Sequence, residues 1–165
     1  MLCRPSPSQR LSIAARAAYA PAMLTDLFLQ MPGHYIRRAQ QVSSAYFTEE
    51  LADSELTSVQ MVALVAIVDS PGIDATRLSE IIDFDRATIG GVVDRLERKG
   101  LIQRVVNPED KRSKVMRATP AGKALLDVSL PRVQRVQERI LAPLSPEDRE
   151  TFLRLIKTVI GRQTD

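Results

Sequence analysis

Apolar residues repeat at helical spacing near both ends of the chain. From His34 to Leu51 an apolar side chain recurs every three or four residues, with arginines and glutamines between, which is the pattern of an amphipathic helix. A second long helix is predicted to begin at Pro120 and to be kinked by Pro131. A closing helix is predicted after Ser145, and its apolar stripe comprises Phe152, Leu155, Ile156 and Val159.

Three shorter helices are predicted between these long ones. Thr57 and Gln60 have the spacing of a capping box, and the apolar run that follows, residues 59–68, is expected to be buried on all sides. Asp74 can cap the next helix and Asp85 the one after it. The last two helices are therefore expected to be separated by only a tight turn.

The helix that follows Asp85 has two distinct faces and runs to about Lys99. Its apolar stripe is a single line of residues, Ile89, Val92, Val93 and Leu96. The opposite face comprises Thr88, Gly91, Arg95 and Arg98, flanked by Arg86, Gly90 and Asp94. After Gly100 the pattern changes from helical to alternating, which predicts a β-hairpin with a charged tip at residues 107–110.

This order of elements is typical of a winged helix-turn-helix. A short helix, a tight turn, a helix with a polar outer face and a charged hairpin follow one another in that fold. The second helix of the pair enters the major groove of DNA, so the segment from Arg86 to Lys99 is the expected recognition helix. The predicted fold class is mainly α with a small β-hairpin wing.

The distribution of charge supports an interface with DNA. The 165 residues include 23 Lys and Arg against 20 Asp and Glu, a formal net charge of only +3. Residues 86–117, however, hold nine basic and four acidic side chains, a local net charge of +5, which leaves −2 for the rest. Concentrated positive charge releases counterions from DNA. Basic helix faces can also be merely solvated, so the charge supports DNA binding only together with the order of elements.

Composition excludes several other classes of protein. The chain has one cysteine, Cys3, and one histidine, His34, so no catalytic residues, zinc set or other metal site is expected, and no cofactor. No apolar run is long enough to cross a membrane. The expected protein is a soluble, cytoplasmic non-enzyme. Residues 1–31 are interpreted as an N-terminal arm; a transit peptide, or a start at Met23 or Met31, stays open.

Several motifs resemble one family of bacterial regulators. The stretches DRATI at residues 85–89, VDRLERKGLI at 93–102, NPEDKR at 107–112 and TPAG at 119–122 closely resemble the MarR family of transcriptional regulators. The resemblance covers about residues 33–162. The stretch PGHYIRR at 32–38, together with Gly90 and Gly91, is most similar to a subgroup that controls degradation of aromatic acids.

The resemblance implies a homodimer that binds a pseudo-palindromic operator in double-stranded DNA. Residues 32–56 and 119–162 would supply N- and C-terminal dimerisation helices, and residues 57–118 the winged helix-turn-helix, within one continuous domain. The family implies a repressor released by a small molecule, here an aromatic acid or its coenzyme A thioester. The alternatives are an effector-independent winged-helix protein and a redox-responsive one, for which Cys3 is a poor sensor.

The resemblance also assigns DNA-binding residues. On the recognition helix they are Arg86, Thr88, Gly90, Gly91, Arg95 and Arg98, and on the wing Lys111, Arg112 and Lys114. Arg112 would enter the minor groove, and Asp110 would brace the wing by forming an ion pair with a basic side chain. Asn107 replaces the aspartate that many relatives have before the wing proline.

Two adjacent glycines within one helix are unexpected, because each costs about 0.5–1 kcal/mol relative to alanine. Gly90 and Gly91 either let the recognition helix seat against base edges or relieve crowding against a neighbouring helix.

The expected effector residues are His34, Tyr35, Arg38 and Met61. An imidazole and a guanidinium can bind a carboxylate or phosphate, while Tyr35 and Met61 form an apolar wall. The alternative is that His34 is an ordinary hydrogen-bonded surface residue and that the arginines only face solvent or DNA.

Overall fold

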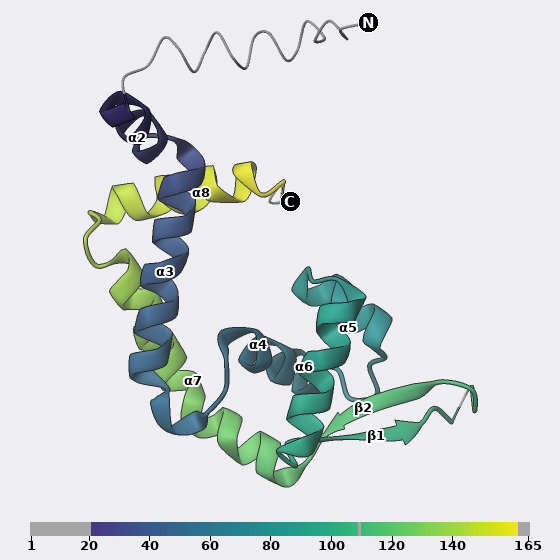
Figure 1. The fold of residues 1–165 in the computed structure, drawn as a ribbon. Helices are drawn as coiled ribbons and strands as arrows, with labels where there is room; N and C mark the ends of the chain where they lie inside the picture. Colours follow the sequence, from purple (N-terminus) through teal and green to yellow (C-terminus); the bar gives the residue numbers. More distant parts are fainter. Residues whose placement is uncertain (1–20, 109, 162–165) are drawn as a thin grey trace, which may run out of the picture. The chain divides into compact units, whose positions relative to one another are not determined.

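The computed structural model describes residues 21–108 and 110–161, which are largely helical (Figure 1). The chain divides into two compact units, the first ending at Val42 and the second beginning at Ser43. In order, the elements are α2 (Pro21–Leu29), α3 (Pro32–Glu50), the 3-10 helix η1 (Ala52–Ser54), α4 (Ser58–Asp69), α5 (Ala75–Ile82), α6 (Arg86–Arg98), β1 (Ile102–Val106), β2 (Lys114–Ala118), α7 (Pro120–Leu141) and α8 (Pro146–Val159). The predicted order of elements and the fold class are confirmed.

Side-chain caps start the helices where the sequence predicts them. In the capping box of α4, Gln60 donates its backbone N–H to Thr57 Oγ1 at 3.3 Å, and Thr57 donates its own to Gln60 Oε1 at 3.1 Å. Asp74, Asp85, Thr119 and Ser145 each accept a backbone N–H in the first turn of α5, α6, α7 and α8. These bonds satisfy amide donors that a helix leaves unpaired at its start.

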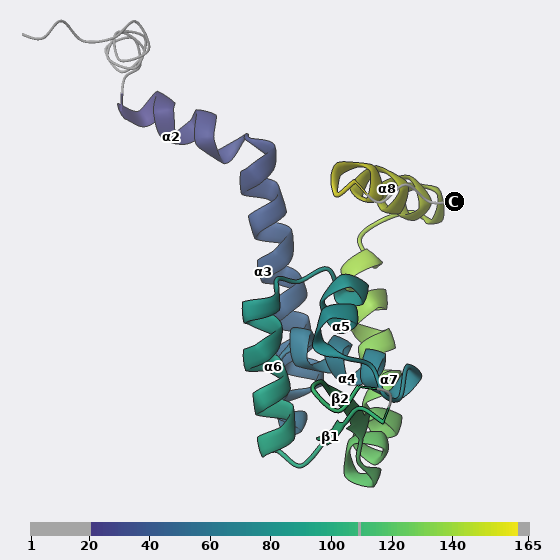
Figure 2. The same ribbon diagram turned by 90° about the vertical axis from the view of Figure 1, so that its right-hand side faces the viewer.

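The apolar core of the second unit is built around α4. This helix packs against α5, α6, α7 and β2, and Figure 2 shows it among the other helices. Leu64 and Ile67 on α4 are fully buried, as are Leu78 on α5 and Leu96 on α6. The expectation that all of residues 59–68 are buried is wrong at Val62, which is 49% exposed because it occupies the side of α4 that these neighbours do not cover.

The two strands form an antiparallel hairpin, the wing, in which Arg104 pairs with Met116. The base of the wing is joined to the loop before α5. Met116 donates its N–H to the Ile73 carbonyl at 2.8 Å, and Gly72 donates to the Met116 carbonyl at 2.9 Å. The wing therefore starts from a fixed position beside the helix-turn-helix.

Helix α8 has an apolar face that stays exposed in the second unit. None of its residues is buried, and Leu155 and Val159 are 51% and 69% exposed. Helix α7, by contrast, contributes buried Leu126 and Val136 to the core and continues through Pro131. None of the described helices combines the length and apolar content that a membrane crossing requires.

Candidate DNA interface

The outer face of α6 is exposed along its whole length. Ile89, Val92, Val93 and Leu96 point into the core, so the residues between them face solvent. All six recognition-helix residues expected from the sequence are exposed: Arg86, Thr88, Gly90, Gly91, Arg95 and Arg98. The structure therefore brings these residues together on one accessible surface, which we call the groove face.

The cap of α6 also orients Thr88. Asp85 Oδ1 accepts the Thr88 backbone N–H at 2.9 Å, and Asp85 Oδ2 accepts the Thr88 hydroxyl at 2.6 Å. These two bonds hold the pKa of Asp85 below its ordinary value, the side-chain bond being the larger cause. The start of the recognition helix is thus held by an ionised carboxylate, which is favourable at a helix N-terminus.

The two glycines of α6 adjoin open space. A methyl group added at Gly90 or Gly91 would have no heavy atom within 4 Å beyond the neighbouring residues and the backbone of its own helix. No neighbouring helix needs this room among the described residues, so the crowding explanation is wrong for that part of the chain. The space beside the two glycines, which we call the glycine gap, is open to solvent on the groove face.

An ion-pair cluster joins the wing to the recognition helix. Arg104 on β1 donates to Asp94 Oδ1 at 2.8 Å, and to Glu97 Oε2 through both Nε, at 2.8 Å, and Nη2. These bonds lower the pKa of Glu97 and raise that of Arg104. Arg104 is one of the nine basic residues of the segment 86–117, but Asp94 and Glu97 of the same segment compensate its charge. No local pattern signals this contact, since it depends on where β1 passes α6.

The tip of the wing presents three exposed cations, Lys111, Arg112 and Lys114. Asp110 is near them but acts differently from the expectation. Among the described residues, Asp110 forms no ion pair with a basic side chain. Its Oδ1 accepts the backbone N–H of Arg112 at 3.0 Å, and its carbonyl accepts from Ser113. Asp110 therefore shapes the wing turn through the backbone.

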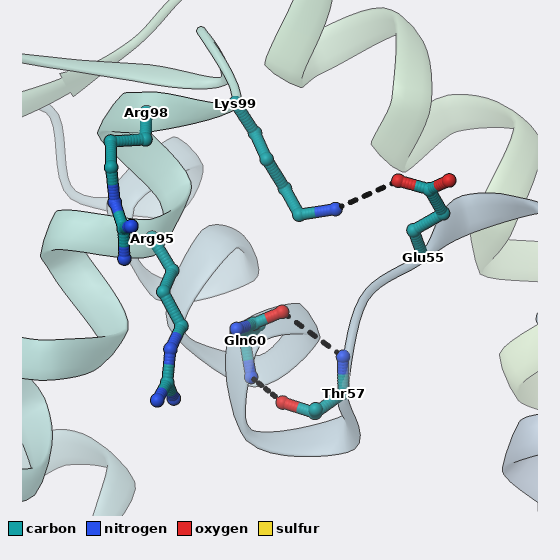
Figure 3. Close-up of a pocket in the computed structure, with 6 residues that line it drawn as sticks. All are labelled: Glu55, Thr57, Gln60, Arg95, Arg98 and Lys99. Atoms are coloured by element: carbon teal, nitrogen blue, oxygen red, sulfur yellow. Dashed lines mark hydrogen bonds and ion pairs between the residues drawn. The ribbon is translucent and has the colours of Figure 1, made fainter.

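A pocket of about 370 Å³ lies at the C-terminal end of the groove face (Figure 3). Arg95, Arg98 and Lys99 line it from α6, and Glu55 with the capping-box pair Thr57 and Gln60 lines it from the start of α4. Lys99 Nζ donates to Glu55 Oε2 at 3.2 Å. Sequence reasoning missed Glu55 and Lys99 as a pair, because 44 residues separate them.

The four expected effector residues lie in different units. His34, Tyr35 and Arg38 are on α3 before Val42, whereas Met61 is on α4 and only 2% exposed. The His34 and Tyr35 rings meet edge to face with centroids 6.0 Å apart. His34 Nδ1 lies 3.4 Å from a guanidinium nitrogen of Arg37, and Arg38 donates to Gln41 Oε1 at 3.1 Å.

The described residues include no group of three or more His, Cys, Asp or Glu side chains placed to hold a metal ion. Cys3, the only thiol considered for redox sensing, lies outside the described residues. The basic groove face, its glycine gap and the cationic wing define the class of protein: a winged helix-turn-helix that binds DNA.

Comparisons with known proteins narrow this class to a family. The model of the MarR family matches residues 56–114. The transcriptional repressor NicR of Pseudomonas putida is 34% identical over 128 residues, which are 78% of this chain and 81% of NicR. The chain therefore belongs to the MarR family of transcriptional regulators.

Solved structures agree with this assignment over most of the chain. PcaV of Streptomyces coelicolor, in complex with its natural ligand, is 35% identical with a TM-score of 0.75, covering 80% of this chain and 93% of PcaV. BpsR of Bordetella bronchiseptica, whose DNA binding is regulated by 6-hydroxynicotinic acid, is 29% identical with a TM-score of 0.76, covering 84% of this chain and 97% of BpsR.

Proposed function

We propose that this protein is a dimeric repressor that binds a pseudo-palindromic operator and is released from it by a small aromatic acid. The observation that carries the proposal is the groove face of α6, where exposed arginines flank a gap left by two glycines. The wing cations Lys111, Arg112 and Lys114 extend the same positive surface. Arginines on a groove-entering helix read guanines and bind phosphates, and a wing arginine suits the narrow minor groove.

A dimer is supported by the uncovered apolar face of α8. Phe152, Leu155, Ile156 and Val159 stand at helical spacing and are all exposed, and large apolar patches on a soluble chain mark association surfaces. Two copies would place two recognition helices on one face of the duplex. The half-sites are then expected about 10–10.5 base pairs apart, centre to centre.

The effector class rests on the relatives together with the chemistry of α3. BpsR responds to 6-hydroxynicotinic acid, an aromatic acid. In this chain the start of α3 displays an imidazole at His34, a phenol at Tyr35 and a guanidinium at Arg38. The guanidinium is suited to a carboxylate, or to the phosphates of a coenzyme A thioester. Met61 is part of the core, so it could contact an acid only if the acid enters that core.

The test uses a duplex that the full-length protein selects from random DNA. Fluorescence anisotropy with that duplex should show tight, sequence-selective binding, and titration with 6-hydroxynicotinic acid, 4-hydroxybenzoic acid and benzoyl-coenzyme A should show release by at least one. His34→Ala and Arg38→Ala should bind the duplex normally but resist release, while Lys123→Ala, on α7, should behave like the wild type. Unaltered release from both α3 variants would refute the effector site. Binding that no acid releases would favour the effector-independent alternative.

Dimerisation needs its own measurement. Light scattering should give twice the chain mass for the wild type, and Leu155→Glu should lower it because the substitution places charge on the α8 face. Val106→Glu, at a similarly exposed apolar residue on the wing, is the control and should stay dimeric. A dimeric Leu155→Glu variant would remove α8 from the interface.

A further inference from the structure

The pocket beside Lys99 has the composition of an anion site. Each of the six residues that line it is polar or charged, and three cations, Arg95, Arg98 and Lys99, face one carboxylate, Glu55. The pocket therefore has an excess of two positive charges. None of the six is an aromatic or aliphatic residue, so the pocket offers an aromatic ring no apolar side chain to pack against.

The three cations differ in how far they are already engaged. Among the described residues, no carboxylate lies within ion-pair distance of Arg95, and Figure 3 draws no interaction between its guanidinium and the other five pocket residues. Arg98 uses its Nε on the Asp94 carbonyl at 3.2 Å. Lys99 is the one that a carboxylate holds, through its 3.2 Å contact with Glu55.

The ion pair between Lys99 and Glu55 is easily broken. The Glu55 side chain is 81% exposed and that of Lys99 32% exposed. Exposed pairs contribute little to stability because water and salt screen them. Lys99 can therefore leave Glu55 for a stronger anion at small cost to the fold.

The pocket is continuous with the groove face. Arg95 and Arg98 belong both to the pocket and to the stripe that starts at Thr88, since residues three and four apart lie on one side of a helix. The N-terminus of α4 also opens onto the pocket, and its partial positive charge favours an anion. A DNA strand that follows the recognition helix would bring its phosphates to this end.

We propose that this pocket binds a phosphate of the DNA backbone through Arg95 and Lys99. In the unbound protein Glu55 forms an ion pair with Lys99 and so competes with that phosphate. The inference rests on the proposed function, because it names a backbone contact of the same DNA-binding surface. Glu55 thereby lowers the affinity of the protein for DNA of any sequence. Its role is in positioning Lys99; it makes no contact with DNA.

Counterion release gives the expected size of the effect. Each phosphate that a cation neutralises on B-DNA adds about 0.9 to the negative slope of log K against log salt concentration. Loss of the Lys99 contact should therefore flatten the slope by about 0.9 for each recognition helix on the DNA. Between 50 and 200 mM salt, this corresponds to a roughly 3.5-fold smaller loss of affinity per contact.

The experiment compares four variants of the full-length protein on its selected duplex and on an unrelated duplex. Glu55→Gln keeps the side-chain shape and frees Lys99, so it should tighten binding to both duplexes. Lys99→Met keeps the aliphatic stem and should weaken binding to both and flatten the salt slope. In the double variant, Glu55→Gln should no longer tighten binding beyond the general effect of one lost negative charge. Glu138→Gln, an exposed carboxylate on α7, measures that general effect.

The outcomes separate this inference from the proposed function. Wild-type protein that binds no DNA would contradict the proposed function itself. Wild-type binding with a salt slope that Lys99→Met leaves unchanged would overturn the phosphate contact alone. Equal tightening by Glu55→Gln and Glu138→Gln would overturn the competition. Calorimetry with inorganic phosphate should show no binding at millimolar concentration, because one free ion lacks the rest of the DNA strand; tight binding abolished by Lys99→Met would assign the pocket to a free anion instead.

Discussion

Replacing either glycine of the recognition helix by alanine should raise the stability of the protein and lower its affinity for DNA. Gly90→Ala and Gly91→Ala each add one methyl group within a helix, at a position with no heavy atom within 4 Å outside the immediate backbone. In the unbound protein nothing resists that methyl group. Alanine exceeds glycine in helix propensity by about 0.8–1.0 kcal/mol, so each variant should be more stable by about that amount. For a chain of this size, this corresponds to a rise in melting temperature of about 2–4 °C.

On DNA the same methyl group should be unfavourable. If the groove face lies against base edges, the added group must be accommodated in a packed interface, which typically costs about 1–3 kcal/mol. That cost corresponds to a roughly 5-fold to 140-fold weaker operator affinity for each recognition helix affected. Stability and affinity should therefore change in opposite directions.

Circular dichroism melting and fluorescence anisotropy measure the two quantities on the same preparations. Gly33→Ala, at a helical glycine of α3 that also adjoins open space, is the control and should raise stability without lowering affinity. Operator binding that is unchanged or tighter in both recognition-helix variants would refute the groove contact. A fall in melting temperature would refute the open space around the glycines.

Three further predictions concern the supports of the DNA-binding surface. A methyl group at buried Gly122 would lie 2.1 Å from the Leu101 carbonyl oxygen, so Gly122→Ala should destabilise the protein by about 3 kcal/mol in urea unfolding; an unchanged midpoint would contradict that contact. Arg104 lowers the pKa of Glu97, so this ion pair stabilises the fold above pH 4.5, the ordinary pKa of a glutamate, and loses its effect as the pH falls below that value. Arg104→Met should therefore lose less stability than the wild type over that acid range. Parallel profiles of unfolding free energy against pH would count against the pair. Arg112→Ala should weaken operator binding and flatten its salt slope by about 0.9 per wing, whereas an identical slope would remove this wing residue from the interface.

Local signals in the sequence were sufficient for the helices and their starts. The capping box of Thr57 and Gln60, the caps at Asp74 and Asp85 and the start of α7 depend only on residues three or four apart. The groove face could be predicted for the same reason, since the apolar stripe of α6 determines which residues lie opposite it. Periodicity therefore located most of the candidate DNA interface.

Contacts between distant segments could not be predicted in this way. Residue Val62 has apolar neighbours along the chain, but its exposure depends on where α5, α6 and α7 pack. The partners of Arg104 depend on how the chain turns at Gly100, whose φ is +70°, before β1 returns beside α6. The proximity of Lys99 to Glu55 depends on how α4 and α6 pack, and no local pattern reports it.

The hydrogen bond from the Thr88 hydroxyl to Asp85 limits which groups of a DNA base Thr88 can contact. Its single proton is already donated to the carboxylate at 2.6 Å, so it cannot also be donated to a base. What Thr88 can still offer the groove is the acceptor side of its hydroxyl oxygen and its methyl group, and the methyl group suits the 5-methyl group of thymine. If the operator has a thymine opposite Thr88, replacing it by deoxyuridine should weaken binding, and 5-methylcytosine should be bound more tightly than cytosine at that position. The cap that starts the helix would thereby make one base position sensitive to pyrimidine methylation.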